Sequence, residues 1–559
     1  MKENQRLQIR WWLWLGLALT IFKLWLTRAQ PIYAISNAYL DDRLFMEMAQ
    51  TLVLGDWLGA YSQFTLAKGP CYSFFIAALF YLGVPLGLAQ QGLYAGACAI
   101  FACAFKPVFS RGTQLAIYLL LLWNPMSYEA PTLGRVMRQH LVIPLAIIIF
   151  AGLIALYLRR TEPLKRLWQW SILLGFAIGL FWITREESIW ILPSILLLAA
   201  VILYGAWQSS RTAFHTVIKV GLLVLACAAL PSNIVSWQNY RHYGWFGTVE
   251  FKASEFKAAY GALQRVEVGP QYFQVPVTQE TREAIYPLSP AFKTLRPWLE
   301  RDAWTSVAPA PEGRQIHGGW FMWALRESVA LAGHTSSANE ALDFYQTLAD
   351  EINSACDSGL IPSGPRRDSM IPSFRDGQIA EVARTFIRFG DFVATFNSFS
   401  AFPKLSIGDR EELKLFHDLT RDELSSSVRA PTIERPNQEE LRLWKFKLLQ
   451  KIGGHSITVL ILLCVFTHII ACIRVIQAVS NRAPTYPLLV AAAAWGGVAS
   501  FLLINSLVHV LSFSVTAVST FSPVYPLLII FYIAVFWDAI TAWFPRAPQT
   551  ALSTTLSAE

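Results

Sequence analysis

The chain has 559 residues, of which 54% are hydrophobic and only 15% are charged, whereas about a quarter of the residues of an average soluble domain carry a charge. This composition excludes an ordinary soluble enzyme, because the chain contains long apolar runs that carry almost no charged residues. The net charge of +8 does not indicate a nucleic-acid partner, since the basic residues form short clusters between these runs. The sequence therefore predicts an all-α polytopic membrane protein.

About ten segments are apolar and long enough to cross a bilayer, whose hydrocarbon core of about 30 Å requires roughly 20 residues of helix. The expected spans are 11–29, 87–105, 112–127, 140–158, 167–184, 188–206, 215–236, 455–477, 486–510 and 520–544. The run 72–86 is also apolar, but it is short and contains Pro85. We expect it to form an interfacial helix, because a crossing here would move every later loop to the other side.

The basic clusters set the expected topology. With the N-terminus inside, the inner loops carry Lys106 and Arg111; Arg159, Arg160, Lys165 and Arg166; Arg211; Arg474 and Arg482; and Arg546. This arrangement satisfies the positive-inside rule. It places the first outer loop, 30–70, and the long segment 237–452 together on the outer face. The chain contains no Asn-x-Ser/Thr sequon, and we expect a plasma (inner) membrane.

The segment 237–452 changes abruptly to mixed, charged sequence and is large enough for its own core. Within it, 337–356 shows apolar residues at helical spacing after serine cap candidates, and 376–396 and 409–419 are similar. We therefore expect an inserted, mainly helical extracytoplasmic domain. The expected division is a transmembrane module 1–236, the extracytoplasmic domain 237–452, C-terminal transmembrane helices 453–545 and a short cytoplasmic tail 546–559.

The common motifs of soluble enzymes are missing. The sequence has no Gly-x-Gly-x-x-Gly, no Gly-x-x-x-x-Gly-Lys-Ser/Thr, no His-Glu-x-x-His and no Gly-x-Ser-x-Gly. Its seven cysteines form no disulfide framework and no Cys-x-x-Cys metal pair. The candidate chemistry is therefore confined to charged residues that are expected at the outer membrane surface.

An acidic pair, Asp41-Asp42, follows the first span. It precedes a run in which Phe45, Met48 and Leu52 recur at helical spacing, and this pattern predicts an amphipathic interfacial helix. The two carboxylates could cap that helix and interact with its dipole. Alternatively, they could serve a site where a water-soluble acceptor meets a lipid head group.

Lys68 and the pair Arg185-Glu186 are expected at head-group depth, next to apolar segments. Lys68 could extend its ammonium to water along apolar surface, or it could neutralise a lipid phosphate or pyrophosphate. Charges at membrane depth usually pair or serve a site. Arg185 and Glu186 could therefore either join two helix ends or contribute to such a site.

The loop between the third and fourth expected spans contains Glu129, Arg135, Arg138 and His140. It is expected outside despite its basic residues, which is an exception to the charge rule. Guanidinium groups that bind a phosphate or diphosphate would explain this exception. The alternative is a solvated loop without such a role.

Three short motifs follow one another in the run 39–82: Asp41-Asp42, Gly55-Asp56-Trp57 and Lys68-Gly69-Pro70. Their order and spacing resemble the GT-C superfamily of integral-membrane glycosyltransferases, in the branch of protein O-mannosyltransferases and lipid A aminoarabinose transferases. Arg185-Glu186 and the Tyr525-Pro526 element are similar to later elements of that branch. The chain departs from the family pattern at Gly69, where relatives have a proline, and in the position of its large outer domain, which lies between spans.

The resemblance implies an inverting transfer of a sugar from a polyprenyl-phosphate carrier, a membrane lipid, to an extracytoplasmic acceptor, either an envelope glycan, a lipid or a protein. Asp41, or alternatively Asp42, would be the general base. The implied substrate-binding residues are Lys68, Arg135, Arg138, Arg185 and Glu186. Of these, Lys68, helped by Arg185 and Arg135, would neutralise the leaving phosphate. No metal ligand set is assigned, and a divalent metal between Asp41 and the donor phosphate stays open.

Two other classes of protein would also fit the composition. A transporter or flippase would use intramembrane charges along a pathway, but inverted repeats with matching broken helices are not evident in the sequence. A non-catalytic scaffold would bind other envelope proteins through its outer domain. Such a scaffold would tolerate neutral residues in place of Asp41 and Asp42.

Overall fold

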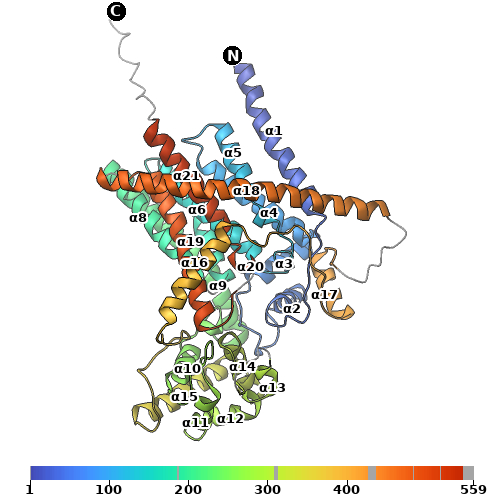
Figure 1. Ribbon diagram of the computed structural model, residues 1–559, viewed down its shortest axis with the longest axis vertical. Helices are drawn as coiled ribbons and strands as arrows, with labels where there is room; N and C mark the ends of the chain where they lie inside the picture. The colour runs from blue at the N-terminus through green and yellow to red at the C-terminus, as the bar shows by residue number, and fades with distance from the viewer. Residues whose placement is uncertain are drawn as a thin grey trace, which may run out of the picture.

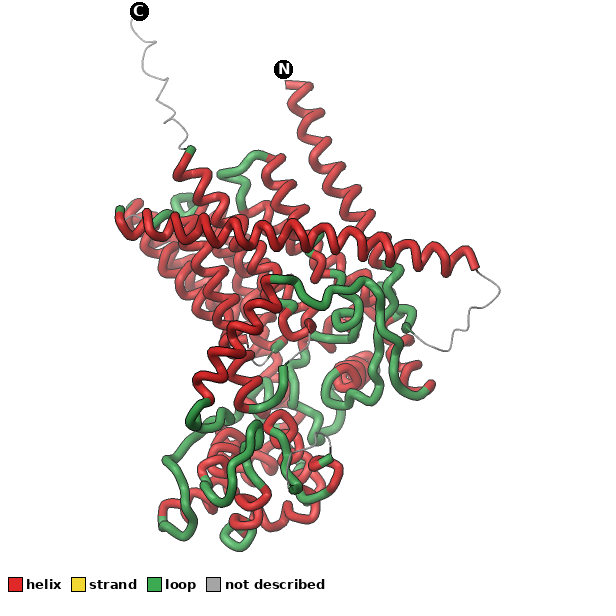
Figure 2. The backbone as a smooth tube through the Cα atoms, in the orientation of Figure 1, coloured by secondary structure: helices red, strands yellow, loops and turns green. Residues whose placement is uncertain are grey.

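The computed structural model describes residues 2–185, 188–306, 313–425, 436–481, 484–515 and 518–544. Within these ranges all regular secondary structure is helical, and extended backbone pairs only in isolated bridges (Figure 2). The expected cytoplasmic tail 546–559 and the site candidate Glu186 lie outside the described residues.

Eight helices of the described chain are long and apolar enough to cross a membrane. They are α4 (Leu86–Ala104), α6 (Gln139–Leu158), α7 (Leu164–Thr184), α8 (Leu192–Ser209) with the preceding turn η2 (Ser188–Ile191), α9 (Arg211–Tyr243), α18 (Pro436–Ser480), α19 (Tyr486–Leu511) and α21 (Val524–Trp543). The other two expected spans coincide with shorter apolar helices, in α1 (Lys2–Thr27) and α5 (Arg111–Leu122). The prediction of an all-α polytopic membrane protein is confirmed.

The centre of the bundle is formed by the helices that are apolar on every side. α6 and α21 are buried along most of their length, as expected for helices without a polar face. α7 packs against α9, and α19 packs against α21. The contact between α7 and α9 depends on small residues, because a Cβ at Gly175 or Gly179 would lie 2.6 or 2.5 Å from a backbone oxygen of α9.

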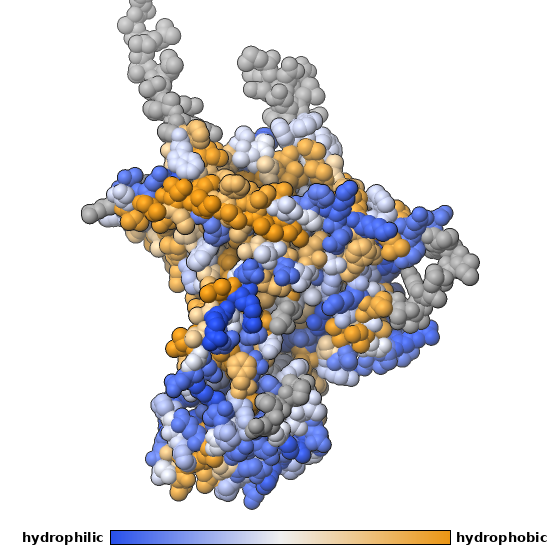
Figure 3. Space-filling view, viewed as in Figure 1, coloured by the Kyte–Doolittle hydropathy of each residue, from blue (hydrophilic) through white to orange (hydrophobic). Residues whose placement is uncertain are grey.

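The surface of the molecule divides along its long axis. α18, a helix of 45 residues, lies across one face of the bundle (Figure 1). Hydrophobic residues gather over the later part of α18 and the neighbouring helices, whereas the beginning of α18 and the helical domain at the far end are largely hydrophilic (Figure 3). This division is consistent with lipid around the bundle and water around the domain.

The segment 30–70, expected as the first outer loop, and the segment 237–452 meet on the same side of the bundle. Extended backbone near Ile32 and Ile35 pairs with Leu424 and Ile407. Three helices pack together beside this contact: α2 (Asp42–Val53), α3 (Cys71–Leu82) and α17 (Arg410–Thr420). The two polar regions therefore share one side of the molecule, as the sequence predicts. α3 ends at Leu82 with Gly83 as its C-cap, before the membrane helix α4 begins at Leu86.

A compact helical domain has a hydrophobic core of its own, between Ala253 and Ile361. Its elements are η3 (Glu250–Lys252), α10 (Ser254–Arg265), α11 (Gln279–Ile285), α12 (Pro290–Leu299), α13 (Asp302–Thr305), α14 (Gly318–Leu331) and α15 (Ala338–Asp357). α15 matches the expected helix 337–356 and begins where the Ser337 side chain accepts a hydrogen bond from the backbone N–H of Glu340, at 3.2 Å.

The remainder of the segment 237–452 packs elsewhere, which differs from the single domain that the sequence predicts. α16 (Gln378–Ala394) lies against α19, because its buried face, including Val382, Phe389 and Val393, meets membrane helices. α17 packs on α2 and α3. The two helices nevertheless fall at the positions expected from their periodicity.

Candidate functional site

The acidic pair lies at the start of the amphipathic helix α2. Leu44, Phe45 and Met48 form its buried face, which confirms the predicted periodicity. Asp41 occupies the N-cap position, but its side chain makes no capping hydrogen bond. The capping interpretation of this carboxylate therefore does not hold, and the Asp41 side chain has another partner.

That partner is Lys68. The Lys68 ammonium donates a hydrogen bond to Oδ1 of Asp41 and forms an ion pair with it. The Lys68 side chain is 9% exposed, whereas that of Asp41 is 49% exposed. The ammonium nitrogen also lies 5.2 Å from the centre of the Phe45 ring, a distance at which a cation interacts with the ring face. Lys68 is thus held in place while Asp41 remains open to solvent.

Asp42 is arranged differently. Its side chain has no exposed surface, and both carboxylate oxygens accept hydrogen bonds from Arg135, with 3.1 Å between Nε and Oδ1. Such a two-point contact fixes the orientation of both groups. Asp42 therefore positions the Arg135 guanidinium and is not accessible to a substrate.

The two neighbouring carboxyl groups differ in pKa. Burial alone would raise the pKa of Asp41, but the positive charges of Lys68, Arg138 and Arg135 outweigh it and hold the pKa below its usual value. For Asp42, burial dominates over the contact with Arg135 and raises the pKa to about 6. Separated pKa values in adjacent carboxyl groups are typical of sites in which the two groups have different tasks.

The loop that carries Arg135 is held by a buried carboxylate. Oε2 of Glu129 accepts hydrogen bonds from Thr132, at 3.1 Å from N and 2.7 Å from Oγ1, and from the backbone N–H of Leu133 at 3.0 Å. The backbone N–H of Tyr33 donates to the carbonyl of Gly134 at 2.9 Å. Glu129 thus organises the turn before Arg135, and we assign it no contact with substrate.

Arg138 lies near the same centre, since its guanidinium carbon is 6.0 Å from the Phe45 ring. Sequence reasoning identified Phe45 only as part of an apolar face. In the structure two cations, Lys68 and Arg138, lie over this aromatic side chain. No local signal in the sequence indicates this contact. The structure therefore adds Phe45 to the site as the apolar support of its positive charges.

Arg185 lies at the C-terminal end of α7, where it is half-buried. This helix end touches the loop of Lys68, because a Cβ on Gly69 would lie 2.0 Å from the backbone oxygen of Ile183. The departure from proline to Gly69 therefore has a steric reason. Five predicted residues meet at the start of α2, namely Asp41, Asp42, Lys68, Arg135 and Arg138. Arg185 follows Ile183, which contacts Gly69, by two residues in the sequence.

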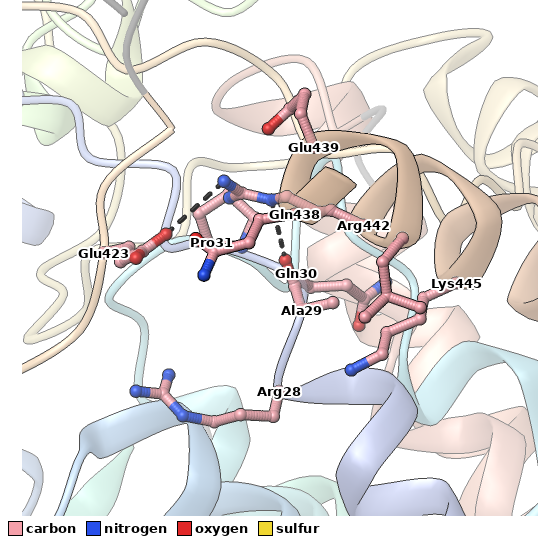
Figure 4. A pocket seen from close by; sticks show the side chains of 10 residues that line it. Arg28, Ala29, Gln30, Pro31, Glu423, Gln438, Glu439, Arg442 and Lys445 are labelled. Carbon is pink, nitrogen blue, oxygen red and sulfur yellow. Dashed lines mark hydrogen bonds and ion pairs between the residues drawn. The ribbon is translucent and has the colours of Figure 1, made fainter. Parts of the chain in front are cut away.

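A separate cavity of about 310 Å³ lies where the end of α1 meets the beginning of α18 (Figure 4). Its side chains include Arg28, Glu423, Arg442 and Lys445. Arg442 donates to the carbonyl of Ala29 at 3.1 Å and pairs with Glu423. None of the predicted site residues lines this cavity. Arg28 pairs with Asp422, which lies outside the lining.

Metal binding was left open by the sequence. Among the residues that the structure describes, no group of three or more His, Cys, Asp or Glu side chains converges in a way that could hold a metal ion. A metal that depends on a bound donor phosphate would need ligands from that phosphate as well as from the protein.

Comparisons with known proteins give little further information. No protein family model matches the sequence, and no curated protein matches it. A solved structure with a similar arrangement is the crystal structure of ArnT from Cupriavidus metallidurans in the apo state, at 12% sequence identity and a TM-score of 0.32. The match covers 95% of this chain and 77% of that one. At this distance the likeness carries no argument about the site.

Proposed function

We propose that the protein is an integral-membrane glycosyltransferase that moves a sugar from a polyprenyl-phosphate carrier to an extracytoplasmic acceptor. The observation that carries the proposal is Asp41, a half-exposed carboxylate that is ion-paired to Lys68 and does not cap its helix. The resemblance of the run 39–82 to GT-C glycosyltransferases supports the same function. A donor phosphate and an acceptor hydroxyl would meet at this ion pair.

In the proposed reaction, Asp41 is the general base. Its carboxylate accepts the proton of an acceptor hydroxyl or amine while the acceptor atom attacks the anomeric carbon. The bond between this carbon and the phosphate oxygen breaks, and its electron pair leaves with the polyprenyl phosphate. A single displacement of this kind inverts the anomeric centre.

Lys68 has two partners during the proposed cycle. In the free protein it pairs with Asp41 and keeps that carboxylate ionised. When a donor phosphate binds, the ammonium turns to the phosphate, and Asp41 loses part of the positive charge that lowers its pKa. The carboxylate then becomes a stronger base at the moment when the leaving phosphate is neutralised.

The remaining residues of the cluster act on charge and orientation. Arg138 is close enough to lower the pKa of Asp41, and we assign it to the donor phosphate together with Lys68. Arg135 is held by the buried carboxylate of Asp42, so Asp42 is a positioning residue. We also propose Arg185 and Glu186 as residues that bind the sugar donor, on the basis of the family resemblance.

The proposed location is the plasma (inner) membrane, with the helical domain on the extracytoplasmic side. There the domain would meet a glycan, lipid or protein acceptor, while the carrier tail stays among the membrane helices.

The proposal is tested by complementation of a deletion strain, with mass spectrometry of envelope lipids, polysaccharides and glycoproteins. The wild-type protein should restore a missing sugar that Asp41→Asn does not restore at equal expression. Glu47→Gln is the matched control, because Glu47 lies on the same helix, pairs with Arg43 and makes no contact with Lys68. Full restoration by Asp41→Asn would contradict the proposal and favour a transporter or a scaffold.

A further inference from the structure

A buried ion pair connects the helical domain to the loop of Lys68. Arg326 on α14 and Glu250 in η3 are both 1% exposed and form an ion pair. The hydroxyl of Tyr61, in the first outer loop, donates to Oε1 of Glu250 at 2.6 Å. The guanidinium of Arg326 lies 5.5 Å from the Phe251 ring. Charges this deeply buried are costly unless every partner is in place.

The same two residues hold the backbone that leads to Lys68. Nη2 of Arg326 donates to the carbonyl oxygen of Thr65, and the backbone N–H of Glu250 donates to the carbonyl oxygen of Leu66 at 2.8 Å. The helical domain thus binds successive carbonyl groups directly before Ala67 and Lys68. These contacts join parts of the chain that are far apart in sequence.

The backbone at Leu66 is in an unfavourable conformation. Leu66 has a φ of 60°, a left-handed conformation that a leucine rarely adopts, and its side chain is fully buried. Such a conformation persists only when surrounding contacts hold it in place. The hydrogen bonds from Glu250 and Arg326 to this segment are contacts of that kind.

We infer that the Glu250–Arg326 pair is a positioning device through which the helical domain holds Lys68 against Asp41. The residues of the pair act on the site through the backbone of Thr65 and Leu66 and do not touch the ion pair of Lys68 itself. The catalytic consequence rests on the proposed glycosyltransferase function, whereas the positioning itself does not.

The test replaces the pair without leaving a buried charge. Glu250→Gln with Arg326→Met keeps similar volumes and removes both charges, and such replacements of buried pairs are often tolerated. The matched control is Arg282→Met with Glu300→Gln. Arg282 is fully buried and pairs with Glu300, which is 17% exposed, in the helical domain, and their hydrogen bonds reach no residue of the Lys68 loop. Unfolding curves of both proteins establish that they are folded.

The structural readout is the reactivity of Ala67→Cys towards a thiol reagent, quantified at residue 67 by mass spectrometry. Ala67 is 1% exposed, so its cysteine should react slowly in the parent protein. Local opening in the Glu250/Arg326 variant should raise this rate at least about tenfold, with little change in the Arg282/Glu300 control. Equal rates in all three proteins, or an equal increase in both double variants, would overturn the inference.

The kinetic readout is the pH dependence of transfer. Lys68 lowers the pKa of Asp41 in the free protein, so a displaced Lys68 lets this pKa rise and moves the acid limb of the kcat/KM profile, which reports the free protein, to higher pH. The shift should occur in the Glu250/Arg326 variant and be absent from the control. If the variant labels faster at residue 67 but its acid limb does not shift, the link between the Glu250–Arg326 pair and Asp41 is overturned. If Asp41→Asn transfers normally, the proposed function fails, and the labelling rates still decide the positioning.

Discussion

Two ion pairs at opposite ends of the bundle differ in what their carboxylates can reach. Asp538 on α21 is fully buried and binds Arg474 of α18, at 2.6 Å from Nε, as well as the hydroxyl of Thr485. Asp538 lies near the C-terminal end of α21, which is on the same side of the bundle as the beginning of α1 (Figure 1). Asp41 and α2 follow the opposite end of α1 (Figure 1). Asp41, in contrast, pairs with Lys68 but keeps half of its side chain exposed.

This difference separates a structural contact from a candidate reactive group. Arg474 also donates to Oε1 of Gln477 at 2.6 Å, so the pair with Asp538 is enclosed by side chains from three helical segments. A charged pair near a membrane is therefore not by itself evidence of chemistry. An ion pair whose carboxylate remains accessible, as Asp41 does, can exchange its partner when a substrate arrives.

The largest expected effect is on transfer by Asp41→Asn. Loss of the general base should lower the transfer rate by about 10²–10⁴-fold. The loss of stability should be smaller than for removal of the whole carboxyl group, because asparagine keeps an oxygen that can accept a hydrogen bond from the buried Lys68 ammonium. Initial rates with purified protein and thermal unfolding in the same detergent measure both quantities. If Asp41→Asn loses activity because the protein unfolds, the Asp41–Lys68 pair would be a structural contact like the Asp538–Arg474 pair.

Asp538→Ala should have the opposite pattern. Removal of one partner leaves Arg474 buried without its counter-charge, which costs about 3–5 kcal/mol of stability. The rate per folded molecule should stay unchanged, since the pair is remote from Asp41. Adding Arg474→Met should recover most of the stability. Denaturation and rate measurements on both proteins test this. A loss of transfer per folded molecule would show that the Asp538–Arg474 pair has a role in the reaction.

Lys68→Met should lower the transfer rate by about 10²–10³-fold, the usual cost of removing one group that stabilises a developing charge. It should also change the pH profile of the remaining activity. Lys68 lowers the pKa of Asp41 in the free protein. Since Asp41 must be ionised to act as a base, its higher pKa in the variant moves the acid limb of the kcat/KM profile to higher pH. An unshifted limb would contradict the pairing of these two side chains in solution.

The smallest effect is expected for Glu47→Gln. Glu47 pairs with Arg43 on the exposed side of α2, at 2.7 Å, and a pair of this spacing contributes about 0.3–0.5 kcal/mol. Transfer should be unaffected. A large loss of activity would show that any change of charge on α2 disturbs the site, and the effect of Asp41→Asn would then lose its specificity.

Part of the site was predictable because the chemistry is local. The acidic pair, the amphipathic spacing after it and the lysine before an apolar helix all lie within one short run of sequence. The division of labour between Asp41 and Asp42 was not predictable. It depends on Arg135, which the loop after α5 brings to Asp42 from a distant part of the chain.

The sequence by itself indicated that the protein lies in a lipid bilayer, where its membrane helices are, and that both polar regions share one side. These follow from composition and from periodicity along single segments, which need no knowledge of distant neighbours. Only the tertiary structure decided which carboxylate is open, how α16 and α17 pack, and how Glu250 and Arg326 hold the loop of Lys68. Burial and ion pairing depend on residues far apart along the chain, and a single sequence does not specify those contacts.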